Sequence, residues 1–141
     1  MMIVDLINHL QQPTGDTCES TCIAMVTGIP LDQVVKEFHD HYCTGKLEPA
    51  KYLMRFKIHP RLCKTTERYP QWDKVYIVTV PSLNTKGLNH SIVWDLRDDE
   101  TPIYDPCKGR KGAHYYTNNA LEAAEVEEAH LLQSYCLELE F

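Results

Sequence analysis

The sequence predicts an α+β domain in which N-terminal helices pack on a C-terminal antiparallel β-sheet. In the first half of the chain, apolar residues recur at helical spacing. From about residue 74 onward, β-branched and aromatic residues form short runs that turn-prone segments separate. The length of 141 residues suits one domain spanning 1–141, and a domain of this size buries roughly two-thirds of its unfolded surface.

Three helices are expected in the first half of the chain. The first covers residues 18–27 and ends at Gly28, a residue type that caps helix C-termini. The second covers 29–42 and the third 48–57, both with apolar residues at helical spacing. The first helix is expected to turn one apolar face toward the core, formed by Cys18, Cys22, Met25 and Val26.

The second half is expected to supply the sheet. Strands are predicted over 74–83 and 90–96, with a short third strand over 102–105 after a charged turn. A further helix is predicted over 118–132, and the alternating residues 135–141 are typical of a closing strand. This order places strands next to one another in the chain, which favours antiparallel pairing.

The charge distribution and the N-terminus exclude several classes of protein. The net charge is −6, and the densest basic stretch, 108–112, is short and lies between glycines, so nucleic-acid binding is not expected. The N-terminal segment has neither a secretory signal nor a membrane span, which indicates a cytoplasmic protein without membrane contact. In a reducing compartment the six cysteines (18, 22, 43, 63, 107 and 136) are expected to be thiols.

The metal-ligand patterns in the sequence are weak. The chain has no Cys-x-x-Cys pair, and no obvious second pair of ligands elsewhere could complete a metal site with Cys18 and Cys22. His39 and His41 could supply ligands, but two residues apart on a helix their side chains diverge. We therefore expect no metal and no other cofactor.

Cys18 has the position that a nucleophilic thiol requires. It follows a Pro-Thr-Gly-Asp turn and opens a predicted helix, so the positive end of the helix dipole favours its thiolate. Cys22 lies one turn deeper and is expected to pack in the core. A disulfide between them is not expected, because adjacent turns of a helix hold two thiols poorly for that bond.

Three other residues could complete a site around Cys18. His90 begins a predicted strand and is the candidate base, and Asp105 ends the strand expected beside it. If these strands pair across the turn at 96–102, Asp105 can orient the His90 ring, whereas Asp95 lies on the other face of the His90 strand. Gln12 precedes Cys18 across a turn, where its amide could hold an oxyanion.

Two segments carry a family resemblance. QPTGDTCESTCIAMVTG resembles the nucleophile motif of the bacteriocin leader peptidases, papain-like domains that cut double-glycine leaders, and NHSIVWDL followed by IYDPCKG is similar to that family's histidine and aspartate motifs. The resemblance spans roughly residues 8–110. It implies a papain-like fold, with Cys18 as nucleophile, His90 as base, Asp105 as its orienting partner and Gln12 as oxyanion donor. It implies no cofactor.

One residue departs from that family pattern. The family has glycine after its nucleophile, and this chain has Glu19. A carboxylate there is expected to oppose thiolate formation and to narrow the cleft, unless its side chain points away into solvent.

The function expected from these residues is that of a cysteine peptidase or a related amide-bond hydrolase. Its substrate would be a peptide or protein, processed through an acyl-enzyme on Cys18. A deamidase or acyl-transfer enzyme would use the same residues with another acceptor. A papain-like fold that binds peptides or proteins without catalysis is the alternative from another class. The sequence does not fix an oligomeric state.

Overall fold

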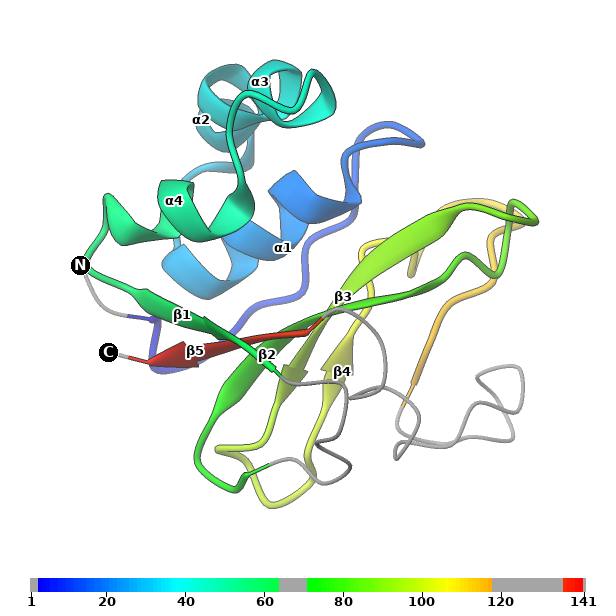
Figure 1. Cartoon of the computed structure of the whole chain (residues 1–141). Helices are drawn as coiled ribbons and strands as arrows, with labels where there is room; N and C mark the ends of the chain where they lie inside the picture. Colours follow the sequence, from blue (N-terminus) through cyan, green and yellow to red (C-terminus); the bar gives the residue numbers. More distant parts are fainter. Residues whose placement is uncertain (1–2, 64–70, 118–135, 141) are drawn as a thin grey trace.

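The protein is an α+β structure in which helices cover one face of a five-stranded antiparallel sheet (Figure 1). The computed structural model describes residues 3–63, 71–117 and 136–140. Its helices are α1 (Cys18–Thr27), α2 (Leu31–Val34), the π-helix η1 (Val35–His39), α3 (Asp40–Cys43) and α4 (Pro49–Met54). Its strands are β1 (His59–Leu62), β2 (Val75–Pro81), β3 (Asn89–Asp95), β4 (Ile103–Tyr104) and β5 (Cys136–Glu140).

The helices precede the strands in the chain, as the sequence predicted. The helix predicted over 29–42 is interrupted by η1, and α4 stops before the predicted end at 57, where Lys57 has a positive φ of 62°. Strand β1 was not predicted at all. The helix predicted over 118–132 lies outside the described residues.

The strands follow the order β1-β5-β2-β3-β4, so β5 lies inside the sheet between β1 and β2. The antiparallel β3–β4 pairing places Val93 opposite Tyr104, so the chain leaving β4 runs toward the beginning of β3. This pairing carries Asp105, directly after β4, toward His90. The predicted approach of these two strands across the 96–102 turn is therefore present.

Apolar residues cover both faces of the sheet. On the helix side, Val75, Ile77 and Val93 pack with the helices, while Tyr76, Ile92 and Trp94 form a second cluster on the opposite side. Two covered faces explain why β2 and β3 are continuous apolar runs rather than alternating ones.

Helix α1 is the centre of the helical layer. All of its residues from Glu19 to Thr27 are buried, so the expectation of a single apolar face was wrong. The reason is that α2, η1 and α4 pack around α1 while β3 lies beneath it. Gly28 ends the helix as predicted: its φ of 74° is left-handed, and its N–H bonds the Ala24 carbonyl at 2.9 Å.

A buried carboxylate joins β5 to its neighbours. Glu138 accepts hydrogen bonds from Arg61 on β1 at 2.9 Å and from the Tyr76 hydroxyl on β2 at 2.8 Å. Burial alone would raise the pKa of Glu138, but these two donors outweigh burial and lower it. None of the helices in the described part of the chain is long and apolar enough to span a membrane.

Candidate active site

Cys18 lies at the first turn of α1 and is only half-buried. The turn before it is ordered by Thr17, whose hydroxyl accepts a hydrogen bond from the Thr14 N–H at 3.2 Å and whose carbonyl accepts one from the Thr21 N–H at 3.0 Å. The unpaired N–H groups of a helix N-terminus carry partial positive charge. The thiol is therefore accessible at the end of the helix that stabilises an anion.

His90 and Asp105 form a buried pair. The His90 Nε2 lies 2.6 Å from Asp105 Oδ1, and both side chains are less than a tenth exposed. A carboxylate only accepts, so Nε2–H is the donor and Nδ1 is the nitrogen left for another partner. Burial lowers the pKa of His90, but the hydrogen bond to Asp105 and the interaction with the Cys18 thiol outweigh burial and raise it to about 9.

Asp105 is held by more than His90. Its Oδ1 also accepts from the Cys107 N–H at 2.8 Å, and its Oδ2 accepts from the Tyr116 N–H at 2.7 Å. The His9 ring donates to the Asp105 carbonyl at 2.8 Å. These contacts fix both the backbone and the carboxylate, so Asp105 can hold the His90 ring in one orientation.

Asp95 has a different role. At the far end of β3 it accepts two hydrogen bonds from the Arg97 guanidinium, at 2.9 and 3.0 Å. The structure therefore separates Asp95 from His90, as the strand geometry predicted.

Gln12 is buried beside this group. Its Nε2 donates to the Thr14 carbonyl at 2.7 Å, and its Oε1 accepts from the Cys107 thiol at 3.4 Å. Its backbone N–H donates to the Pro106 carbonyl at 2.9 Å, which ties the segment before Cys18 to the segment after Asp105. An amide nitrogen has two hydrogens, so one remains for a ligand.

A cleft of about 380 Å³ brings these residues together. Cys18, His90 and Gln12 all line it, with Cys107 beside them. The rest of the lining is mainly polar or basic, and is formed by Gly15, Ser82, Asn84, Thr85, Leu88, Asn89, Arg110, Lys111, Gly112 and Ala113. Three of the four residues selected from the sequence thus reach one cavity, and the fourth, Asp105, lies behind His90.

Cys22 differs from Cys18 in its exposure to solvent and in its position along α1. Both are free thiols, so they form no disulfide with each other. Cys22 is fully buried, and burial, followed by the charges of Glu19 and Cys18, raises its pKa well above the ordinary value. A buried and protonated thiol packs but does not attack.

Glu19 neither points into solvent nor lines the cleft, so both expectations for it were wrong. Its side chain is buried and accepts a hydrogen bond from the Ser91 hydroxyl. Burial raises the pKa of Glu19, although the Ser91 bond and the charge of His90 act in the opposite direction. Glu19 follows Cys18 and Ser91 follows His90, so this bond fixes α1 against β3 directly beside the thiol and the imidazole.

Replacing Glu19 with alanine is expected to destabilise the fold by about 1–3 kcal/mol, because Ser91 then loses its buried partner. Cys18 alkylation should also slow, because α1 is no longer held against β3. Glu19→Gln keeps an acceptor and should retain most of both properties. Urea unfolding and alkylation rates measure the two effects, with Glu48→Ala as an exposed control. Equal stability of Glu19→Ala and Glu48→Ala would show that the Glu19–Ser91 hydrogen bond does not hold α1 against β3.

Sequence reasoning missed four contributors to this site. His9, Ser91, Cys107 and Tyr116 hold the residues around the cleft through contacts with partners far away in the chain. Two signals were readable: Ser91 directly follows the candidate base, and Cys107 lies two residues after Asp105. His9 and Tyr116 gave no local signal, because one contact involves a backbone carbonyl and the other a backbone N–H.

Comparison with known proteins gives no match. No protein-family model, no curated protein and no solved structure matches this chain.

Proposed function

We propose that the chain is a cysteine peptidase, or a related amide-bond hydrolase, of papain-like architecture, similar to the bacteriocin leader peptidase domains. The observation that carries this proposal is the arrangement of Cys18, His90 and Asp105 around one cleft. A half-exposed thiol at a helix N-terminus shares a cleft with an imidazole that is hydrogen-bonded to a buried carboxylate. These are the parts that thiol-based acyl transfer requires.

Cys18 is the nucleophile of the proposed reaction. Its thiolate attacks the scissile carbonyl carbon, and the resulting oxyanion is held by the Cys18 backbone N–H and the free Nε2–H of Gln12. The His90 imidazolium then donates its proton to the leaving amine as the carbon–nitrogen bond breaks. The acyl group remains on Cys18 as a thioester.

Water completes the reaction. Neutral His90 takes a proton from a water molecule, the hydroxide attacks the thioester carbonyl, and the acid is released from Cys18. Asp105 holds the ring so that Nδ1 faces the thiol throughout, and it stabilises the imidazolium form. The raised pKa of His90, about 9, supports its role as proton donor because it keeps the imidazole protonated at neutral pH.

Selective alkylation tests the proposal without a known substrate. Limited iodoacetamide at mildly acidic pH, followed by peptide mapping, should label Cys18 ahead of all other cysteines, since only a thiolate reacts under these conditions. Cys22 should label last because it is buried.

His90→Ala is the decisive variant, and it should erase the preference for Cys18. Ala replacement of the exposed His41 should leave the preference intact. If Cys43 or Cys107 labels first in the wild-type protein, Cys18 is not the nucleophile and a non-catalytic binding module becomes the better assignment.

A further inference from the structure

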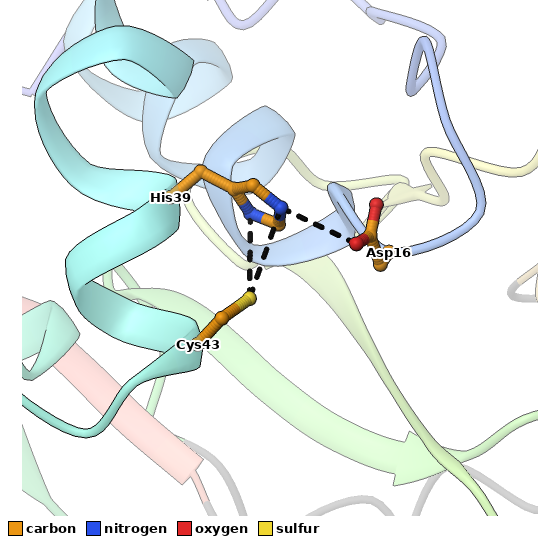
Figure 2. A group of neighbouring side chains, drawn as sticks. All are labelled: Asp16, His39 and Cys43. Carbon is orange, nitrogen blue, oxygen red and sulfur yellow. Dashed lines mark hydrogen bonds and ion pairs between the residues drawn. The ribbon is translucent and has the colours of Figure 1, made fainter.

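A second group of metal-ligating side chains lies outside the cleft. Asp16, His39 and Cys43 each offer a ligand atom, and these atoms all lie within 4.8 Å of one another. Figure 2 shows the His39 ring between the Asp16 carboxylate and the Cys43 sulfur. Asp16 comes from the turn before α1, whereas His39 ends η1 and Cys43 ends α3. The proposed hydrolase mechanism uses none of these residues.

Two distances within the group are close to those of a tetrahedral zinc site. His39 Nε2 lies 3.4 Å from Asp16 Oδ2 and 3.7 Å from Cys43 Sγ. Zinc binds sulfur at about 2.3 Å, and nitrogen or oxygen at about 2.0–2.1 Å. At tetrahedral angles these bond lengths place nitrogen about 3.3 Å from oxygen and about 3.6 Å from sulfur. The Cys43 sulfur lies also 3.8 Å from Nδ1, so its side chain must turn toward the Nε2 side of the ring when an ion binds there.

The helix supplies two of these ligands by its spacing. His39 and Cys43 are four residues apart, and on a helix such residues share a face. From the sequence, His39 and His41 are considered as ligands and set aside, because their side chains diverge on a helix. The helix is wound as a π-helix up to His39, a distortion that occurs frequently at functional sites.

We propose that Asp16, His39 and Cys43 bind a Zn²⁺ ion, with water as the fourth ligand. A thiolate and a carboxylate around a neutral imidazole carry two negative charges, which balance the dication. Thiolate and imidazole together select zinc over magnesium or calcium, which prefer oxygen ligands. Because Asp16 lies in the turn before Cys18, the ion would link η1 and α3 to that turn.

Cobalt substitution tests the proposal directly. Co²⁺ titrated into the reduced, metal-free full chain should bind at one equivalent and give the visible bands of a tetrahedral ion with a thiolate-to-cobalt band in the near ultraviolet. Cys43→Ser should lose the thiolate band. His39→Ala and Asp16→Asn should weaken binding at least about tenfold, and His41→Ala should bind like the wild type.

Cys107→Ser controls for the other candidate group, since His90, Asp105 and Cys107 also lie within 4.8 Å of one another. A thiolate band that disappears in Cys107→Ser and persists in Cys43→Ser would overturn the proposal, as would the absence of any band in the wild type. Zn²⁺ should also raise the melting temperature of the wild type and of His41→Ala, but not of Cys43→Ser. Neither readout depends on hydrolysis, so failure here is distinguishable from failure of the proposed enzyme.

Discussion

Replacing Asp105 with asparagine should lower the rate of Cys18 acylation by an activated aryl ester at least about a hundredfold. The carboxylate accepts the Nε2–H of His90, and an amide can also present its nitrogen there, which no longer fixes the tautomer with Nδ1 free for the thiol. Cys107 N–H donates to one carboxylate oxygen and Tyr116 N–H to the other, so asparagine, with a single oxygen, keeps an acceptor for only one of them and should also reduce stability. Stopped-flow acylation and circular dichroism separate the chemical effect from the structural one.

Asp95→Asn is the matched control for this experiment. Asp95 is a buried aspartate that accepts hydrogen bonds from Arg97, at the other end of the strand that carries His90. Its replacement should reduce stability without changing acylation by more than a few-fold. Equal losses of acylation in the two variants would show that Asp105 does not orient His90.

The second large effect expected is a loss of stability at alkaline pH that depends on His90. The pKa of His90 rises from 6.5 to about 9 in the folded chain. The folded state therefore binds the His90 proton more tightly than the unfolded state does. This contribution, up to about 3 kcal/mol, is complete below about pH 6.5 and is lost as the pH rises through about 9.

Urea unfolding of Cys18→Ala and of Cys18→Ala with His90→Gln, at pH 6 and at pH 9.5, measures this contribution. In the absence of Cys18, Asp105 still raises the pKa of His90, although by less than Asp105 and Cys18 do together. The stability gap between the two proteins should narrow at the higher pH. If the difference in stability is the same at both pH values, the pKa of His90 is nearly the same in the folded and unfolded chain, and this prediction is wrong.

The local part of the candidate site was predictable, because it depends on short-range rules. A turn followed by apolar residues predicted that a helix opens at Cys18, and a β-branched run predicted the strand that begins near His90. Asp105 followed from antiparallel pairing across one short turn. Each inference used only neighbours in the chain or a single hairpin.

Contacts between distant segments were not predictable. Glu19 was expected in solvent because a charged side chain on a helix usually lies there, and only the approach of Ser91 gives it a buried partner. Strand β1 was missed since its sequence, HPRL, contains a proline and a charge, both typical of edge strands that local patterns identify poorly. Asp16 was missed as a candidate ligand because His39 and Cys43, its neighbours in the fold, are distant from it in the chain.

The position of β5 has a consequence for how the chain folds. Residues 136–140 insert between β1 and β2, so the middle of the sheet is filled by the strand that comes last in the described chain. Pairs such as Arg61 with Glu138 span 77 residues, and closing such long loops slows folding. During synthesis, β2 and β3 can pair first and leave β2 as an open strand edge. Until β5 docks, that edge offers unpaired backbone groups to any neighbouring chain, so we expect the partly synthesised protein to aggregate more readily than the complete one.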